Sequence, residues 1–388
     1  MKKLAIVVTH PIQYYAPVFK LLAKACVLKV FYTLGSDTED GMYDDGFKQT
    51  IKWDVDLLDG YAFEFLENKA KEQGSHHFMG VKNPDIIQSI KSFDPNVILV
   101  YGWAYQSHLK VLRHFKGKVP IWFRGDSHLL DPKPLWKKLV QKTLLVWVYS
   151  HIDKAFYVGT ANKAYFKSFG LNEDQLIFAP HAVDNERFSE NRSGEADLMR
   201  ENLGIGANKT LILFAGKLEK KKSPELLLKA FLELKMEDAH LLFVGNGELE
   251  ESLKRKAESL KLKAESPKSN IHFMDFQNQS YMPVVYQACD VFCLPSQGPN
   301  ETWGLAVNEA MAASKAILVS DKVGCSKDLI HESNGYIFMS PDLFSIQQNL
   351  REIISSNLKA MGQSSKLIIS EWDFKHQVST FIKTLYAS

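Results

Sequence analysis

The sequence predicts an α/β protein that consists of two doubly wound domains. Short apolar runs recur along the chain, and each is followed by a turn and then by a helical pattern. Runs that are apolar on both faces are typical of parallel strands covered by helices on both sides. They form two groups around a polar stretch at 189–208, which is the best candidate for a linker, and 388 residues are more than one compact core usually holds. We therefore expect domains at 1–188 and 189–371, with a C-terminal helix at about 372–388 packing back on the first.

The expected elements follow one another in order along the chain. In the first domain, the expected strands are Leu4–Val8, Val27–Tyr32, Val97–Tyr101, Pro120–Phe123 and Lys154–Val158. In the second domain, they are Thr210–Phe214, His240–Val244, Asn270–Phe273, Val291–Leu294 and Ala316–Val319. Expected helices include Ala16–Ala25, Pro224–Leu234, Glu248–Leu262 and Gln377–Tyr386. Since ligands of open parallel sheets bind beyond the carboxyl ends of the strands, we expect the two domains to face each other across a cleft.

The composition excludes several classes of protein. Hydrophobic residues make up 45% and charged residues 24% of the chain, and the net charge of +2 gives no basic field for nucleic acid. No run reaches the 18 or so apolar residues that span a bilayer, and the first apolar run is too short for a secretory signal. The four cysteines form neither a CxxC pair nor a disulfide framework. We therefore expect reduced thiols and a cytoplasmic protein.

The turn after Thr210–Phe214 is the first candidate ligand site. Lys217 and Lys222 lie where a phosphate group would approach the end of the strand and the start of the next helix. Ser223 as the N-cap and Pro224 as the first helical residue are favourable for that helix start. A solvated basic turn is the alternative interpretation, and the loop considered alone favours it.

Two further turns carry weaker signals. Gly245 and Gly247 follow the next strand and allow a close approach of the backbone to a ligand, although the third glycine of a dinucleotide fingerprint is missing. Glu301 then stands in a loop before a helix that begins near Gly304, where the free N–H groups and the helix dipole favour an anion. An ordinary turn and a loop acid near a helix start are the alternative interpretations.

Glu309 lies about two turns inside that helix and is followed by Ala310, Met311 and Ala312. This small apolar face is typical of a buried helix. A carboxylate beside it requires a polar partner, and ligand hydroxyls would serve.

The run from Lys217 to Asp328 resembles the C-terminal domain of retaining glycosyltransferases with the GT-B fold, in glycosyltransferase family 4 (glycosyl transferases group 1). The family signature is E-x-F-G-L-x-x-x-E-A-M-A, and Glu301–Ala312 matches it with Trp in place of Phe. Residues 288–296 resemble the A-D-V-F-V-x-P-S strand of the family, and 214–222 resemble its G-R-L…K-G donor loop. Two departures are Lys217 for the usual Arg, which replaces a bidentate fork with a point charge, and Ser223 for the usual Gly.

The resemblance implies a hexosyltransferase that moves a sugar from a nucleotide-diphosphate sugar to an acceptor hydroxyl with retention of configuration. It implies a role in surface polysaccharide or glycolipid assembly, with a carbohydrate or lipid-linked acceptor. It implies that Glu301 is catalytic and that the donor is bound by Gly216, Lys217, Lys222, Gly245, Gly247, Phe276, Thr302, Trp303, Gly304, Leu305 and Glu309. No cofactor and no metal are expected, because the lysines and the helix dipole would neutralise the leaving diphosphate.

The first domain would supply the acceptor side. His10 and Gln13 follow the first strand, and Trp103 follows the third, where its ring could stack on a sugar face. In the family, a His or Asp after the strand at Pro120–Phe123 contacts the sugar, and counting along the chain favours Asp126 as the catalytic group over His128. Structural roles for each of these residues are the alternative.

Other functions remain open at this point. The DxD triplet at Asp54 and Asp56 could hold a metal in the GT-A fold, but a solvated acidic turn explains it better because no nucleotide-binding half precedes it. A nucleotide-sugar 2-epimerase shares the two-domain architecture. A non-catalytic nucleotide-sugar binding subunit is the third hypothesis, and Lys217 keeps it open.

The segment from Pro132 to Lys142 combines lysines on one side of a helix with Leu and Trp on the other. This pattern is typical of a helix at a membrane interface, so peripheral contact with an anionic membrane surface is one interpretation. A surface helix that packs its apolar side on the first sheet is the alternative, and base rates favour it.

Overall fold

The computed structural model describes residues 1–36, 41–44, 46–132, 134–263, 270–299 and 301–387. The chain divides into two compact units. Unit 1 comprises Met1–Met42, Ile51–His181 and Phe374–Ser388, and unit 2 comprises Tyr43–Thr50 and Ala182–Asp373. The C-terminal segment therefore belongs to the first unit, and a short segment from the first half belongs to the second.

Within the described residues, unit 1 contains a sheet of seven strands in the order β5-β2-β1-β6-β7-β8-β9, with parallel pairing throughout. The strands are β1 (Lys3–Val8), β2 (Val27–Tyr32), β5 (Ala62–Phe65), β6 (Val97–Tyr101), β7 (Ile121–Arg124), β8 (Lys154–Tyr157) and β9 (Leu176–Phe178). The helices are α1 (Ala16–Ala23), α2 (Ile86–Phe93), α3 (Gln106–Phe115), α4 (Leu135–Tyr149), α5 (Thr160–Ser168) and α15 (Phe374–Ala387), with 3₁₀ turns η2 (Phe78–Gly80) and η3 (Glu173–Gln175).

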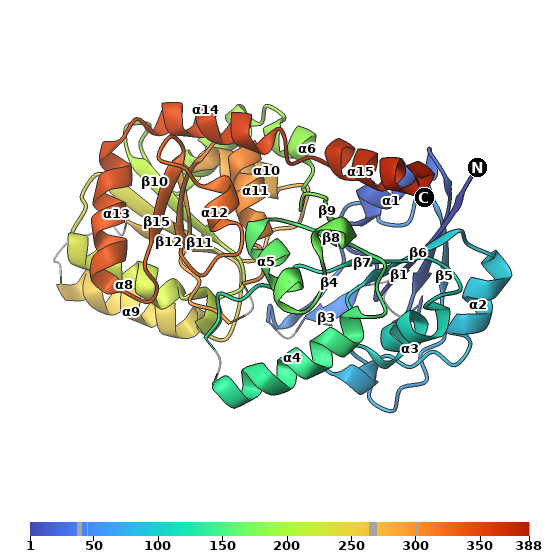
Figure 1. Cartoon of the computed structure of the whole chain (residues 1–388). Helices are drawn as coiled ribbons and strands as arrows, with labels where there is room; N and C mark the ends of the chain where they lie inside the picture. The colour runs from blue at the N-terminus through green and yellow to red at the C-terminus, as the bar shows by residue number, and fades with distance from the viewer. Residues whose placement is uncertain (37–40, 45, 133, 264–269, 300, 388) are drawn as a thin grey trace. The chain divides into compact units, whose positions relative to one another are not determined.

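The helices of unit 1 cover both faces of this sheet. Alternate residues of β1 point to opposite faces: Ala5 and Val7 pack with α2, α3, α4 and α5, whereas Leu4 and Ile6 pack with α1 and α15. Figure 1 shows α15 beside α1, although the two are at opposite ends of the sequence. Burial on both faces explains why the strands of this sheet read as continuous apolar runs.

Unit 2 contains a second parallel sheet, and the described residues give it six strands in the order β12-β11-β10-β13-β14-β15. The strands are β10 (Thr210–Ala215), β11 (Ala239–Val244), β12 (Ile271–Met274), β13 (Val291–Leu294), β14 (Ala316–Ser320) and β15 (Gly335–Phe338). The helices are α6 (Asn185–Ser189), α7 (Ser193–Asn202), α8 (Pro224–Leu234), α9 (Glu250–Lys263), α10 (Met282–Ala288), α11 (Leu305–Ala312), α12 (Ser326–Leu329), α13 (Leu343–Ser355) and α14 (Leu358–Ile369), with the 3₁₀ turn η4 (Lys220–Lys222).

The core of unit 2 lies between the sheet and helices α8, α9 and α13. Phe214 and Phe243 from the central strands pack there with Phe231 of α8 and Leu350 of α13. On the other side α11 packs against β13, β14 and α14. The strand order places β10 and β13 next to each other at the centre, so the order of the chain reverses at this point of the sheet. Such switch points are where parallel sheets bind ligands.

The fold class predicted from the sequence is an α/β fold with two doubly wound parallel sheets, and the structure confirms it. All ten expected strands are present. The expectation of a linker at 189–208 is wrong, because α7 occupies this stretch and packs on α10. Arg200 of α7 fixes the helix by donating to the carbonyl of Ala288 at 2.8 Å and to the carboxylate of Asp290 at 3.1 Å.

The strands that the sequence did not reveal include three at sheet edges, β5, β9 and β15. Their side chains are only partly buried, so they lack the continuous apolar run that identifies a central strand. The remaining two, β3 (Met42–Asp44) and β4 (Gln49–Ile51), pair with each other in a small separate sheet.

No helix in the described part of the chain combines the length and the apolar character needed to cross a bilayer.

Candidate functional site

The candidate site of unit 2 is built from loops at the carboxyl ends of β10, β11, β12, β13 and β14. Because these strands are parallel neighbours, their following loops lie at one edge of the sheet. Hydrogen bonds join the loops to one another. Gln297, after β13, donates its backbone N–H to the carbonyl of Lys221 at 2.9 Å and its side chain to that of Lys220 at 2.8 Å, which ties this loop to the lysine loop after β10.

A buried ion pair joins the lysine loop to the loop before α11. The Nζ of Lys222 lies 2.5 Å from Oε2 of Glu301, and the hydroxyl of Ser296 donates to the same oxygen at 2.8 Å. Burial alone would raise the pKa of Glu301, but the charge and hydrogen bond of Lys222 and the hydrogen bond of Ser296 together lower it below the usual value. Glu301 is therefore ionised at neutral pH, and a fixed negative charge stands beside a fixed positive one.

The start of α11 is held in place by a loop that follows β14. The backbone N–H groups of Gly324 and Cys325 donate to the carbonyls of Glu301 and Trp303 at 3.1 and 3.0 Å. Gly304 precedes the helix with φ of +96°, and a Cβ there would approach Val323 to 2.8 Å. Only glycine fits this position without strain.

Among the other predicted residues of this loop, Thr302 lies beside Gly324, and Leu305 is the first residue of α11. The ring of Trp303 is buried, donates to Asn308 at 2.9 Å and stacks on Trp372. Its side chain therefore supports the loop from within.

Glu309 is buried inside unit 2, and the hydroxyl of Tyr286 on α10 donates to its Oε2 at 2.7 Å. Tyr286 thus supplies part of the polar environment that the buried Glu309 carboxylate was expected to require. Tyr286 also packs edge-on against Phe188, which fixes its ring.

The loops after β11 and β12 are joined by Asn246. Its side-chain oxygen accepts from the backbone N–H of Phe276 at 2.8 Å, and its amide group donates to Asp275 at 3.2 Å. Gly245 and Gly247 flank it with φ of +125° and +159°. A Cβ at Gly245 would collide with the carbonyl oxygen of Gly216, so the two predicted glycines Gly216 and Gly245 face each other closely. The predicted residues Gly245, Gly247 and Phe276 therefore lie around one corner of the sheet edge.

Lys217 has a partner that the sequence did not suggest. Its Nζ lies 2.7 Å from Oδ1 of Asp44, in the short segment from the first half of the chain that belongs to unit 2. The ring of Phe47, in the same segment, lies 5.2 Å from this Nζ.

Ser223 is the N-cap residue of α8, as predicted, but its side chain does not cap the helix. Ser223 makes no side-chain capping bond and adopts a left-handed conformation, with φ of +53° and ψ of 42°. An L-residue other than glycine pays roughly 1–2 kcal/mol in this region. A glycine at this position would adopt the same conformation without that cost.

In unit 1, a polar cluster follows β7. The guanidinium of Arg124 is buried and donates to the carbonyls of Ala179 and Pro180, each at 3.0 Å, which joins β7 to the loop after β9. His181 lies in that loop, 3.9 Å from the carboxylate of Asp126. Burial, with the nearby charge of Arg124, lowers the pKa of His181 well below its usual value, so the histidine is neutral and this contact is not an ion pair.

Asp126 and His128 differ in accessibility. The side chain of Asp126 is 39% exposed and lies beside His181 and Tyr15. His128 is buried, and its Nδ1 accepts the backbone N–H of Leu130 at 3.2 Å. Asp126 thus remains accessible to a ligand, whereas one nitrogen of His128 supports a turn.

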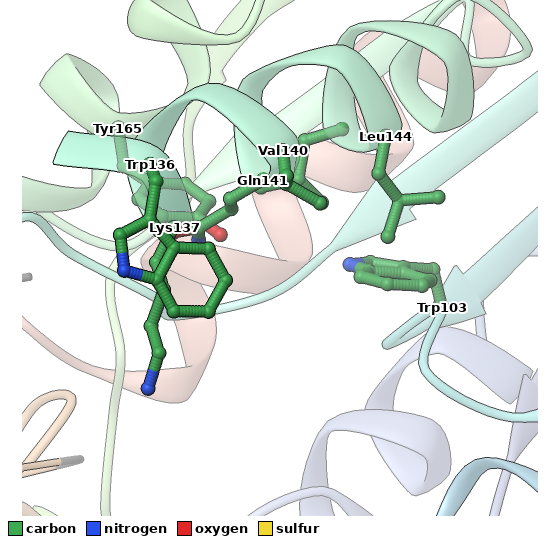
Figure 2. A pocket seen from close by; sticks show the side chains of 8 residues that line it. Trp103, Trp136, Lys137, Val140, Gln141, Leu144 and Tyr165 are labelled. Carbon is green, nitrogen blue, oxygen red and sulfur yellow. The ribbon is translucent and has the colours of Figure 1, made fainter. Parts of the chain in front are cut away.

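The other predicted residues of unit 1 are dispersed along the sheet edge. His10 contacts the hydroxyl of Thr9 at 3.0 Å, and burial lowers its pKa to about 4. Gln13 lies in the turn before α1. Trp103 lines a groove of about 420 Å³ against α4, and Figure 2 shows its indole beneath Leu144. The structure does not place Trp103 in the cluster around Asp126.

Sequence reasoning missed four side chains that the structure places at these sites: Ser296, Asn246, Tyr286 and His181. For Asn246, a polar residue between two glycines at a strand end was a usable signal. The others depend on contacts between segments far apart in the sequence.

Among the described residues, no group of three or more His, Cys, Asp or Glu side chains is arranged to hold a metal ion. Asp56 of the DxD triplet accepts the backbone N–H groups of Leu58 and Asp59 at 3.0 and 3.1 Å, as expected for an acidic turn.

These two sheets define the class of fold. A solved structure of HepE from Anabaena in complex with UDP matches the chain with a TM-score of 0.74 at 15% identity, over 100% of both chains. At this identity the likeness establishes the fold, which is that of GT-B glycosyltransferases with two Rossmann-like domains.

The family is then indicated by the second half of the chain. Residues 195–367 match the family described as glycosyl transferases group 1. An uncharacterized glycosyltransferase of Methanocaldococcus jannaschii is 25% identical over 54% of this chain and 49% of its own length. A lipopolysaccharide 1,2-N-acetylglucosaminetransferase of Salmonella typhimurium is 32% identical over 37% of this chain and 39% of its own length. The chain thus spans less than half the length of these relatives, and its similarity to group 1 glycosyltransferases lies in residues 195–367.

Proposed function

We propose that the protein is a retaining glycosyltransferase of family 4 that transfers a sugar from a nucleotide-diphosphate sugar to an acceptor hydroxyl. The observation that carries the proposal is the buried Lys222–Glu301 pair, which stands between the lysine loop and the start of α11. A cation and a helix N-terminus aimed at one place suit a leaving diphosphate, and a buried carboxylate beside them suits sugar hydroxyls.

The proposal gives the residues the roles that the family resemblance implies. Lys217 and Lys222, with the backbone at Gly304, would stabilise the charge that develops on the leaving diphosphate without a metal ion. Glu301 would orient the sugar, and Glu309 would accept from the ribose hydroxyls. Asp126 would meet the sugar or the incoming hydroxyl from unit 1.

A panel of UDP, GDP, ADP and CMP sugars tests this proposal, with EDTA in one arm. We expect slow hydrolysis of one donor in the absence of acceptor. EDTA should leave this rate unchanged, and NMR should show that the released sugar retains its anomeric configuration. Interconversion of the donor into its epimer would indicate a 2-epimerase instead. Binding with neither reaction would indicate a nucleotide-sugar binding subunit.

We propose that the acceptor is a carbohydrate or a lipid-linked molecule and that the enzyme acts in surface polysaccharide or glycolipid assembly. The enzyme would bind this acceptor at an anionic membrane surface in the cytoplasm. The support for this proposal is α4. The side chains of Leu135, Trp136, Leu139 and Val140 are 63–84% exposed in the first two turns, so these turns do not pack on the sheet. The end of the helix is buried at Leu145 and Val148.

Lysines accompany this apolar surface. Lys137, Lys138 and Lys142 are exposed, and the Nζ of Lys137 lies 5.4 Å from the centre of the Trp136 ring. The groove between α4 and Trp103 opens beside them, and its lining is mostly apolar (Figure 2). An apolar surface with adjacent lysines is suited to the interface of an anionic bilayer.

Co-sedimentation with anionic and neutral vesicles tests this contact. Each lysine near an anionic surface contributes about 1 kcal/mol, so replacing Lys137, Lys138 and Lys142 by Gln should weaken binding about a hundredfold. The matched control replaces Lys229, Lys359 and Lys366, three exposed lysines of unit 2, by Gln. Equal loss in the two triple variants would contradict a specific role for α4.

A further inference from the structure

A short hairpin segment from the first half of the chain, comprising residues 43–44 and 46–50, belongs to unit 2, although both of its flanks belong to unit 1. Asp44 organises its turn by accepting the backbone N–H groups of Gly46 and Phe47 at 2.8 and 3.1 Å. This arrangement is an Asx turn, and it presents the Asp44 carboxylate and the Phe47 ring together.

Both side chains contact residues of the candidate donor site. The carboxylate of Asp44 lies 2.7 Å from the Nζ of Lys217, and the two side chains are partly buried. The ring of Phe47 meets that of Phe276 edge-on, with centroids 4.9 Å apart. A Cβ at Gly46 would collide with the stem of Lys217, so the absence of a side chain there allows the lysine to lie against the turn.

The Asp44–Lys217 contact is an ion pair at neutral pH. Burial alone would raise the pKa of Asp44, but the hydrogen bond and charge of Lys217 and the two backbone N–H groups hold it below its usual value. Lys217 is therefore already neutralised by a carboxylate in this structure.

We propose that Asp44 occupies, on Lys217, the place of a donor phosphate, and that donor binding displaces the hairpin segment from unit 2. The inference rests on the proposed function, because it takes Lys217 as a ligand of the donor diphosphate. A diphosphate that approaches Lys217 would meet the Asp44 carboxylate at short range, and two anions cannot share one partly buried cation without strong repulsion. The diphosphate carries more charge and more acceptor oxygens than one carboxylate, so it wins the competition.

Such competition lowers the apparent affinity of the donor. If only a fraction of the molecules can bind the donor, the observed dissociation constant equals the intrinsic one divided by that fraction. A partly exposed ion pair is weak, so removing it should tighten binding by about threefold to tenfold.

The substitution Asp44→Asn isolates this effect. The Asn side-chain oxygen can still accept the two backbone N–H groups, so the turn is kept while the charge is lost. Asp56→Asn is the matched control, since Asp56 also accepts two backbone N–H groups and belongs to unit 1.

Calorimetry with UDP, GDP, ADP and inorganic pyrophosphate gives the readout. We expect Asp44→Asn to bind its preferred nucleoside diphosphate and pyrophosphate about threefold to tenfold more tightly than the wild type, with Asp56→Asn unchanged. Equal or weaker binding by Asp44→Asn overturns the inference and leaves the donor site intact. If neither protein binds any of the nucleoside diphosphates, the proposed donor site fails, and the inference fails with it.

Hydrogen exchange on the wild-type protein provides a second measurement that needs no substitution. The N–H groups of Gly46 and Phe47 are protected by Asp44 in this structure. Saturating UDP, or whichever nucleoside diphosphate binds, should speed exchange in peptides that contain them. Slower or unchanged exchange would show that the segment stays in place over the bound nucleotide, and would overturn the inference.

Discussion

The two candidate sites differ in whether their carboxylate is buried beside a cation or left partly exposed. In unit 2, the carboxylate of Glu301 is buried and neutralised by Lys222 from a neighbouring loop. In unit 1, the buried cation Arg124 donates to backbone carbonyls, and the nearby carboxylate of Asp126 remains partly exposed beside a neutral histidine. Unit 2 therefore holds its charges before any ligand arrives, which suits the binding of a diphosphate. Unit 1 leaves one carboxylate accessible, which suits a reacting sugar or hydroxyl.

The largest effect should come from breaking the buried pair of unit 2. Lys222→Ala leaves Glu301 buried without its cation, and such a loss costs about 3–5 kcal/mol. Urea unfolding, followed at a probe in unit 2, measures the change. In Lys222→Met combined with Glu301→Gln, most of the stability should return, because no lone charge remains. A Lys222→Ala protein as stable as the wild type would show that the two sites do not differ in this way.

Donor binding should depend on unit 2. Lys217→Ala and Glu309→Gln should each weaken binding of the matching nucleoside diphosphate by about 1.5–3 kcal/mol, the range of a charge-assisted hydrogen bond. Lys220→Ala is the control, because Lys220 is an exposed lysine of the same loop. Calorimetry gives the three affinities. Wild-type affinity in both Lys217→Ala and Glu309→Gln would refute the assignment.

Unit 1 should show its own sensitivity to acid. His108 is fully buried, its Nδ1 lies 3.1 and 3.0 Å from the carbonyls of Tyr101 and Gly102, and its Nε2 lies 2.9 Å from the hydroxyl of Thr33. The two carbonyls make Nδ1 the donor, and in the neutral form Nε2 accepts from the hydroxyl of Thr33.

Burial lowers the pKa of His108 from 6.5 to about 4, so the unfolded chain binds more protons between these values. Stability is complete above pH 6.5 and falls toward pH 4, with about 2 kcal/mol lost at pH 5. Thermal melting from pH 7 to 5 should show this slope in the wild type and in His76→Gln, an exposed control, and a smaller slope in His108→Gln. Equal slopes in all three would place the acid sensitivity elsewhere.

The smallest effect concerns the accessible carboxylate. Asp126→Asn should lower kcat about tenfold while the affinity for the nucleoside diphosphate stays close to that of the wild type, because the proposed donor site lies in unit 2. Steady-state kinetics and calorimetry separate these two quantities. A fully active Asp126→Asn with an inactive His128→Ala would assign the role to His128.

The sequence was sufficient for the parts of the molecule that are buried or locally encoded. Nine central strands and the edge strand β12 could be predicted from their apolar runs, and α8 was predicted with its bounds, Pro224–Leu234. The edge strands β5, β9 and β15 were missed because partial burial leaves no continuous pattern. In the site, the motif indicated Glu301 and Glu309, but their partners Ser296 and Tyr286 are set by the packing of separate segments.

The fold overrides local preference at two places. Ser223 and the stretch at 189–208 were interpreted from local preference, as a helix cap and a linker. Ser223 takes the N-cap position in a left-handed conformation without a side-chain capping bond, and α7 forms because Arg200 and the buried Met199 hold it on unit 2.

The position of α15 in the chain has a consequence for biosynthesis. Phe381 of α15 stacks on Trp122 and meets Phe156, and it completes the apolar face of unit 1 that α1 begins to cover. The ribosome makes α15 only after residues 182–373 of unit 2. Throughout that interval the nascent first unit exposes an uncovered aromatic face, at the stage when exposed apolar surface favours aggregation. Residues 182–373 of unit 2 are thus synthesised before the last helix of unit 1, so unit 1 is completed after the main body of unit 2.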